Sequence, residues 1–225
     1  MIRYFPEIEQ GSDEWLAIRC GVLTASSMRM IMTPTGKAAS NDKERAHMFE
    51  LLAQRITGHV EPQYISDDML RGHEDEILAR AKYAEHYSPV TECGFVTRDD
   101  FGVTIGYSPD GLVGEDGLIE IKSRRMKYQI ETILSDEVPQ EYMLQIQTGL
   151  LVTRRKWLDF VSYSAGLPMF VKRVWPDELT QDAIVTAAHS FEHRNQAALE
   201  KYGRMLAAMP VLIPTERTIE QEIYA

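Results

Sequence analysis

The sequence predicts an α/β (mixed α+β) fold in which helices flank a central mixed β-sheet. Helical patterns with capping residues fill most of the chain before residue 91. Residues 91–123 then change to short β-rich segments separated by Asp and Gly turns, and helical patterns return around two further β-rich segments. A chain of 225 residues can bury a substantial core. We therefore expect one domain over residues 1–225, with its core at about residues 8–175 and a long helix and tail over residues 178–225.

Capping residues indicate the helix boundaries in the first part of the chain. Ser12 and Asn41 each precede a segment with helical apolar spacing, and Gly58 follows the second of these segments. Ser88 and Pro89 end the last one. The helices expected before residue 91 cover residues 13–20, 23–33, 41–58 and 66–88.

The later part of the chain alternates between strands and helices. The expected strands cover residues 91–100, 102–111, 117–123, 156–165 and 169–176. The expected helices cover residues 126–136, 139–153 and 178–209. In the segment 117–123, side chains alternate between the two faces of the strand, so Ile119 and Ile121 share one face while Glu120 and Lys122 share the other.

This charged strand face suggests a metal site. Asp110 precedes the strand by a short turn-rich segment, and it can converge with Glu120 on one hard cation if the two strands are neighbours. Mg²⁺ prefers oxygen ligands and is usually held by one or two carboxylates with waters and phosphate oxygens. Lys122 would then lie beside a water that attacks a phosphate. From spacing alone, the pattern also fits an Asp-Gly turn followed by the solvated face of an edge strand.

Three other features add to the metal hypothesis. Gly72 and Glu76 are four residues apart on an expected helix, so they share a face that could approach the sheet closely. Gln145 lies among apolar residues, where its amide needs a hydrogen-bond partner. Arg19 and Ser26 offer a guanidinium and a hydroxyl that suit a phosphate. Each of these residues taken alone also fits an ordinary surface position.

Composition narrows the class of protein. The formal net charge of −10 argues against indiscriminate binding to nucleic acid, although a local site remains compatible with it because salt screens distant charges. Cys20 and Cys93 are isolated, which predicts a reducing, cytoplasmic location and excludes a four-cysteine iron–sulfur cluster. No apolar run is long enough for a membrane span, and the first residues lack a signal-peptide core.

Five blocks of the sequence, in this order, resemble the phage lambda-type exonucleases. These viral recombinase exonucleases belong to the restriction-endonuclease-like PD-(D/E)xK nucleases, and the resemblance covers roughly residues 8–165. The blocks are EQGSDEWLAIRCGVLTAS, RGHEDE, GYSPDGLV, LIEIKS and EYMLQIQTGLLVTRRKW. The resemblance implies a restriction-endonuclease-like core in a single nuclease domain.

The resemblance also implies roles for the charged strand and its neighbours. Asp110 and Glu120 match the metal-binding acids, and the backbone carbonyl of Ile121 matches a further ligand. Lys122 resembles the lysine that orients or activates the attacking water. Glu76 resembles a helix glutamate that joins the metal site. The implied cofactor is Mg²⁺, with two ions and with Mn²⁺ as a substitute.

A second set of positions matches a pocket for the 5′-phosphate of a DNA end. Arg19, Ser26 and Ser108 match this pocket, and Gln145 matches the family glutamine beside the active site. The positions that match residues at the DNA entrance are Trp15, Met69 and Leu70.

The family activity implied is 5′-to-3′ digestion of one strand of duplex DNA, which releases 5′-mononucleotides and leaves 3′ overhangs. The implied partners are DNA ends, a single-strand annealing protein, and two further copies of the chain in a ring-shaped trimer. A site-specific endonuclease on the same core and a non-catalytic DNA-end-binding recombination scaffold remain alternatives. Magnesium-dependent cleavage would exclude the scaffold, and closed circular DNA would separate the two enzymes.

Overall fold

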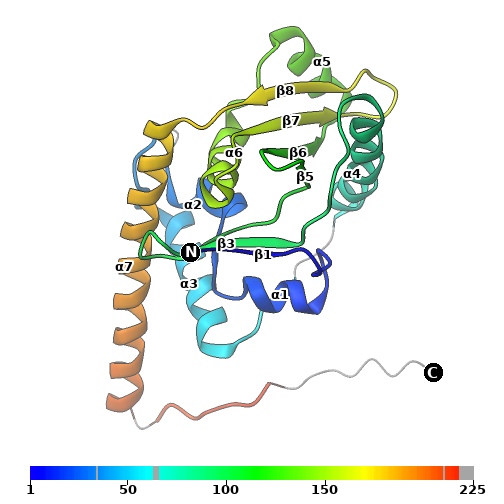
Figure 1. The fold of residues 1–225 in the computed structure, drawn as a ribbon. Coiled ribbons are helices and arrows are strands. Elements are labelled where there is room, and N and C mark those ends of the chain that lie inside the picture. The colour runs from blue at the N-terminus through cyan, green and yellow to red at the C-terminus, as the bar shows by residue number, and fades with distance from the viewer. Residues whose placement is uncertain (34, 63–65, 210, 218–225) are drawn as a thin grey trace, which may run out of the picture.

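The computed structural model describes residues 1–33, 35–62, 66–209 and 211–217, and it contains two four-stranded mixed sheets flanked by helices (Figure 1). The elements are β1 (Ile2–Phe5), α1 (Asp13–Arg19), β2 (Leu23–Thr24), the 3-10 helix η1 (Ala25–Ser27), α2 (Met28–Ile31), α3 (Asp42–Thr57), α4 (Asp67–His86), β3 (Phe95–Arg98), β4 (Ile105–Tyr107), β5 (Gly111–Val113), β6 (Gly117–Ser123), α5 (Met126–Ser135), α6 (Gln140–Thr153), β7 (Trp157–Tyr163), β8 (Phe170–Val174) and α7 (Glu178–Ala208).

Each sheet combines antiparallel and parallel pairs. The first sheet has the order β1-β3-β4-β2, and only its β2–β4 pair is parallel. The second sheet has the order β5-β6-β7-β8, with β6 and β7 parallel and the two outer pairs antiparallel. The mixed α/β class predicted from the sequence is therefore confirmed.

The strand predicted over residues 102–111 is divided between the two sheets. β4 ends at Tyr107, and β5 begins at Gly111 in the second sheet. Pro109 lies between them, and because proline has no N–H it cannot donate to a strand ladder. The expected central sheet is thus two sheets, and the break places Ser108 and Asp110 where the chain crosses from one to the other.

Most expected helices form, and local caps explain their ends. The Asn41 side chain accepts hydrogen bonds from the first turn of α3, and Gly58 ends that helix in a left-handed conformation. The helix expected over residues 23–33 is wrong in its first part, because Leu23 and Thr24 pair with Ile105 and Gly106 as a parallel strand. β1 was not expected at all.

Helices α4 and α6 pack against the second sheet and position the candidate site residues. α4 packs against β6 and β7 on one face, where Ile119 and Ile121 join a cluster with Ala79 and Tyr83 of α4. α6 lies between the two sheets, contacts β3, β4 and β7, and is buried along Ile146–Thr153. The predicted separation of the isoleucines from Glu120 is confirmed: α4 packs on the isoleucine face, and Gln145 of α6 contacts Glu120 on the other face.

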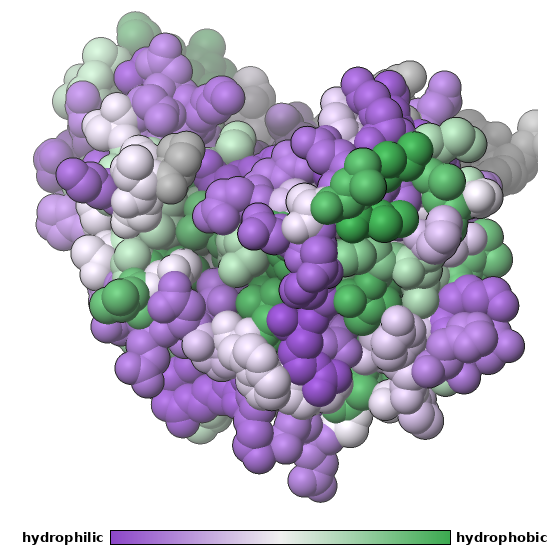
Figure 2. Space-filling model, turned by 90° about the horizontal axis from the view of Figure 1, so that it is seen from above, coloured by the Kyte–Doolittle hydropathy of each residue, from purple (hydrophilic) through white to green (hydrophobic). Residues whose placement is uncertain are grey.

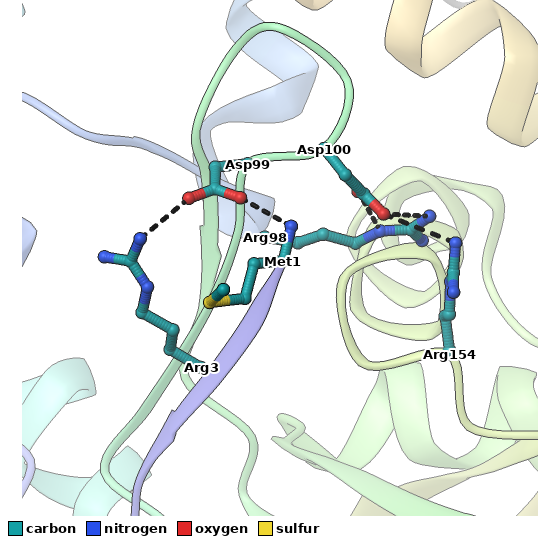
Figure 3. A network of polar contacts seen from close by, with 6 residues as sticks. All are labelled: Met1, Arg3, Arg98, Asp99, Asp100 and Arg154. Atoms are coloured by element: carbon teal, nitrogen blue, oxygen red, sulfur yellow. Dashed lines mark hydrogen bonds and ion pairs between the residues drawn. The ribbon is translucent and has the colours of Figure 1, made fainter.

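A polar network holds β1 and the end of β3 against the C-terminal end of α6 (Figure 3). Asp99 accepts from the N-terminal ammonium of Met1 at 2.6 Å and from Arg3 at 3.0 Å. Arg98 is buried; its guanidinium donates to Asp100 at 2.6 Å and to the Leu151 carbonyl at 2.5 Å. The network therefore supports α6 at its end.

Within the described ranges, no helix has the length and apolar character needed to cross a membrane.

Candidate active site

The pairing of β5 with β6 brings the two predicted acids together. Gly111 lies opposite Ile119 in the antiparallel register, so Asp110 lies beside Glu120 at the end of the short strand. The Ile121 N–H donates to Asp110 Oδ2 at 2.5 Å, which fixes the Asp110 carboxylate against the edge of β6. The sequence predicted that Asp110 and Glu120 converge if their strands are neighbours, and the pairing of β5 with β6 meets that condition.

Glu120 is the centre of a buried hydrogen-bond cluster. Its side chain is completely buried, and its Oε1 accepts from Lys122 Nζ at 2.6 Å and from Gln145 Nε2 at 2.5 Å. Its Oε2 accepts from the Tyr107 hydroxyl at 2.8 Å. Residues of three elements, β4, β6 and α6, therefore meet at this carboxylate.

The electrostatics of the cluster favour an additional cation. Burial and the nearby charge of Glu120 raise the pKa of Asp110 well above its usual range, with Lys122 opposing them. Burial opposes the charge of Lys122, but the carboxylates of Glu120 and Asp110 outweigh it and raise the pKa of Lys122. Lys122 is therefore an ammonium in the metal-free protein, and this single positive charge faces two carboxyl groups.

Glu76 lies in the same cleft as Asp110 but has its own partner. Both residues line a cleft of about 970 Å³, and the Glu76 charge also raises the pKa of Asp110. The Glu76 carboxylate pairs with Arg80 at 2.5 Å, and Arg80 also reaches Glu92 at 2.8 Å. In the ranges that the structure covers, no three His, Cys, Asp or Glu side chains gather as a metal-binding group. The immediate cluster consists of Asp110 and Glu120.

These residues fit a divalent cation with hard-ligand preferences. The oxygens of two adjacent carboxyl groups are the donor set that Mg²⁺ or Mn²⁺ takes, and such ions keep several waters. The Asp110 pKa shift shows that the metal-free arrangement disfavours full ionisation. A bound cation would reverse that effect by pairing with the carboxylates.

Arg19 forms a second polar centre beside the first. Its guanidinium donates to Ser108 Oγ at 3.0 Å and lies 4.0 Å from the centre of the Trp15 ring. Trp15 Nε1 also donates to Ser108 Oγ at 3.0 Å. Burial lowers the pKa of Arg19 to about 10, and no carboxylate in the described part of the chain forms an ion pair with it. A partly buried cation without a counter-charge is suited to an anionic ligand.

The remaining predicted residues surround these two centres. Ser26 and Arg19 line a cavity of about 450 Å³, although Ser26 bonds to Thr24 and not to Arg19. Trp15 lines both this cavity and the cleft of Asp110, so the two spaces adjoin. Met69 and Leu70 are exposed by 52% and 54% in the first turn of α4.

Two site residues were not found from the sequence. Tyr107 bonds to Glu120, and Arg80 bonds to Glu76. Arg80 follows Glu76 by four residues on a helix, which is a local signal for an ion pair. Tyr107 has no comparable signal, because its contact with Glu120 depends on two strands of different sheets.

Comparisons with known proteins agree with this geometry. The family model for a YqaJ-like viral recombinase domain matches residues 14–156. Among solved structures, an alkaline exonuclease (LHK-Exo) from Laribacter hongkongensis has 37% sequence identity and a TM-score of 0.78, with 88% of this chain and 99% of that chain covered. LHK-Exo in complex with dAMP matches at 38% identity, with the same TM-score and coverage.

A more distant structure extends the likeness of fold. A phage related exonuclease from Haemophilus somnus 129PT has a TM-score of 0.54 at 15% identity, with 80% of this chain and 96% of that chain covered. A comparison with curated protein sequences found no match. The resemblance predicted from the five sequence blocks is confirmed. The chain belongs to the YqaJ-like viral recombinase family, as a nuclease related to an alkaline exonuclease.

Proposed function

We propose that this protein is a magnesium-dependent exodeoxyribonuclease that degrades one strand of linear double-stranded DNA from its 5′ end. It would release 5′-mononucleotides and leave 3′ single-stranded overhangs for recombination by strand annealing. The observation that carries this proposal is the junction at residues 107–110. There, Ser108 contacts the unpaired cation Arg19, and Asp110 joins Glu120, so an anion site and a metal-suited site share one short segment.

Asp110 and Glu120 would hold the divalent ions, with the Ile121 carbonyl and Glu76 as further ligands. Divalent ions held there would supply activation of a water and stabilisation of charge on the scissile phosphate. Because Glu76 is paired with Arg80 in this structure, it would have to turn from that partner to reach an ion. Glu76 and Arg80 both line the cleft that contains Asp110, so this movement of the Glu76 side chain would be local.

Lys122 and Gln145 would orient the attacking water. Both side chains now donate to the same oxygen of Glu120, and both are partly exposed, so they can turn toward a water or phosphate. The ammonium of Lys122 supplies a positive charge at the reacting centre. It could remove a proton only after bound ions offset the carboxylates that raise its pKa.

The Arg19 centre would select the end of the DNA strand. Arg19 and Ser108 would bind the 5′-phosphate next to the cleft, together with Ser26, which lines the same cavity as Arg19, and with Gln145. The first phosphodiester bond would then reach Asp110 and Glu120. The alkaline exonuclease relative has been solved with dAMP, a deoxynucleoside monophosphate, which supports release of mononucleotides here. Trp15, Met69 and Leu70 would contact DNA at the entrance.

We further propose a ring-shaped homotrimer that works with a single-strand annealing protein. Two exposed apolar stripes offer surfaces for such contacts: Met126, Ile130, Ile133 and Leu134 on α5, and Tyr202, Met205 and Leu206 on α7. The end of α7 extends past the rest of the molecule (Figure 1). Hydrophobic residues also gather on a largely hydrophilic face seen from the α5 end (Figure 2). Sedimentation as a monomer at working concentration would contradict the ring.

Residues 1–225 would form a single nuclease domain, and its proposed location is the cytoplasm. Cys20 and Cys93 are both free thiols, which suits a reducing compartment. Neither cysteine contacts the acid cluster through a described hydrogen bond.

The decisive experiment is a time course on linear duplexes labelled separately at the 5′ and 3′ ends, with and without Mg²⁺. We expect early release of the 5′ label as a mononucleotide, late release of the 3′ label, and no reaction in EDTA. A covalently closed circle should remain intact, whereas cutting of the circle would indicate a site-specific endonuclease. Binding of ends without any cleavage in Mg²⁺ would indicate a non-catalytic scaffold.

A further inference from the structure

We propose that Tyr107 is a positioning residue that anchors Glu120 by one oxygen and leaves the other oxygen available to a divalent cation. This inference rests on the proposed function of the acid cluster. Tyr107 ends β4, in the first sheet, whereas Glu120 lies on β6, in the second. The hydrogen bond between them, 2.8 Å from hydroxyl to Oε2, therefore joins the two sheets at the acid cluster.

The donors to Glu120 differ in whether they can find another partner. Tyr107 is 1% exposed, and among the described residues its hydroxyl has one hydrogen-bond partner, so losing Glu120 would leave that buried hydroxyl without it. Lys122 and Gln145 are partly exposed and can turn to water or to a ligand. The exchangeable oxygen is therefore Oε1, which these two residues share, and the fixed oxygen is Oε2.

The packing around the Tyr107 ring keeps this anchor in place. Gly149 of α6 lies against the ring, and a Cβ atom there would come within 2.7 Å of Tyr107 Cζ. Gly149 follows Gln145 by four residues, so the two lie on the same face of α6. Gly149 packs against the Tyr107 ring, and Gln145 donates to Glu120. This arrangement explains a glycine in the interior of a helix, where glycine is otherwise unfavourable.

The test compares two buried tyrosines that make the same kind of contact. Tyr107→Phe removes the hydroxyl that donates to Glu120. Tyr83→Phe is the matched control, because Tyr83 is also 1% exposed and donates to the buried Asp159 at 2.7 Å, where Arg173 supplies the accompanying cation. Both changes remove one hydrogen bond between a phenol and a buried carboxylate. Only the first touches the acid cluster.

We would measure Mn²⁺ binding by calorimetry without DNA, thermal unfolding, and the Mg²⁺ dependence of exonuclease rate on linear duplex DNA. We expect Tyr107→Phe to weaken Mn²⁺ binding about 10-fold and to raise the Mg²⁺ concentration for half-maximal rate similarly, as losses next to metal ligands do. KM for DNA should stay unchanged. Tyr83→Phe should lower Tm and leave metal binding unchanged.

Equal Mn²⁺ binding by Tyr107→Phe, Tyr83→Phe and the parent protein would overturn the inference. If Tyr107→Phe does not fold, Gly149→Ala tests the same anchor by displacing the ring while keeping the hydroxyl, and parent-like Mn²⁺ binding by that folded variant would overturn it too. The parent protein separates the two levels of the proposal. If the parent protein binds Mn²⁺ and digests DNA, and Tyr107→Phe and Gly149→Ala do so equally well, only the role of Tyr107 is refuted. If the parent protein neither binds Mn²⁺ nor digests DNA, the proposed function is refuted, and this inference with it.

Discussion

Replacing Arg19 with alanine should remove the preference for a 5′-phosphorylated DNA end. The Arg19 guanidinium is held by Ser108 Oγ at 3.0 Å and by the Trp15 ring at 4.0 Å, and neither partner carries a negative charge. Burial lowers the pKa of Arg19 to about 10, which still leaves it positively charged near neutral pH. A terminal phosphate would supply the missing counter-charge, and an end with only a hydroxyl would not.

The size of the effect follows from the interactions that the guanidinium can make. A hydrogen bond to a charged group contributes about 1.5–3 kcal/mol. One such bond lost with Arg19 corresponds to about a 10- to 150-fold smaller ratio of rates between phosphorylated and hydroxyl ends. Arg19→Lys should keep part of the preference, because the ammonium retains the charge but loses the planar geometry that matches phosphate.

The assay is single-turnover digestion of two duplexes that differ only in the 5′-phosphate. Arg204→Ala is the matched control, since Arg204 lies on the exposed end of α7 and is 71% exposed. It removes the same charge far along the chain from the cleft and should leave the ratio unchanged. An Arg19→Ala protein with the parent ratio would refute the reasoning, and so would a parent with equal rates on both ends.

Three further predictions concern single residues. Lys122→Ala should slow cleavage by about 100-fold or more while DNA binding survives, measured by single-turnover rates and metal-free binding; parent-like cleavage would contradict the assignment. Arg98→Ala should cost about 1–3 kcal/mol by leaving the buried Leu151 carbonyl without its donor, and thermal unfolding should show it as a drop of about 2–4 °C per kcal/mol. Gly106→Ala should destabilise by about 1–3 kcal/mol, because its Cβ would lie 2.2 Å from Phe95 Cζ; an unchanged Tm would show that the ring can move.

Much of the helical structure was predictable because its signals are local. Asn41 and Gly58 bound α3 through contacts within one turn, so a reader of the sequence sees both ends. β2 is different: Leu23 and Thr24 become a strand only because they pair with Ile105 and Gly106, more than eighty positions later. No local pattern carries that information.

The acid cluster shows the same division. Asp110, Glu120 and Lys122 were predictable because strand alternation and a short connection place them together. The role of Tyr107 was not predictable, because an aromatic residue at the end of a strand is typical of the hydrophobic core. Its hydroxyl contacts Glu120 only because the two sheets meet there. The division of the sheet at Pro109, which sequence reasoning missed, is therefore the feature that assembles this part of the site.

The acidic composition of the chain is compatible with a DNA substrate because the proposed contacts are few and enclosed. Binding to duplex DNA through many surface lysines and arginines would depend steeply on salt and would act along the whole duplex. A net charge of −10 disfavours that mode, and the partly buried cation Arg19 packs on Trp15, which lines the cleft of Asp110. An ion pair with a partly buried cation is screened less by salt than one at the open surface, so recognition of a terminal phosphate should survive conditions that weaken binding along the duplex. The negative surface would then add to specificity, since it favours release of DNA that lacks an end in the cleft.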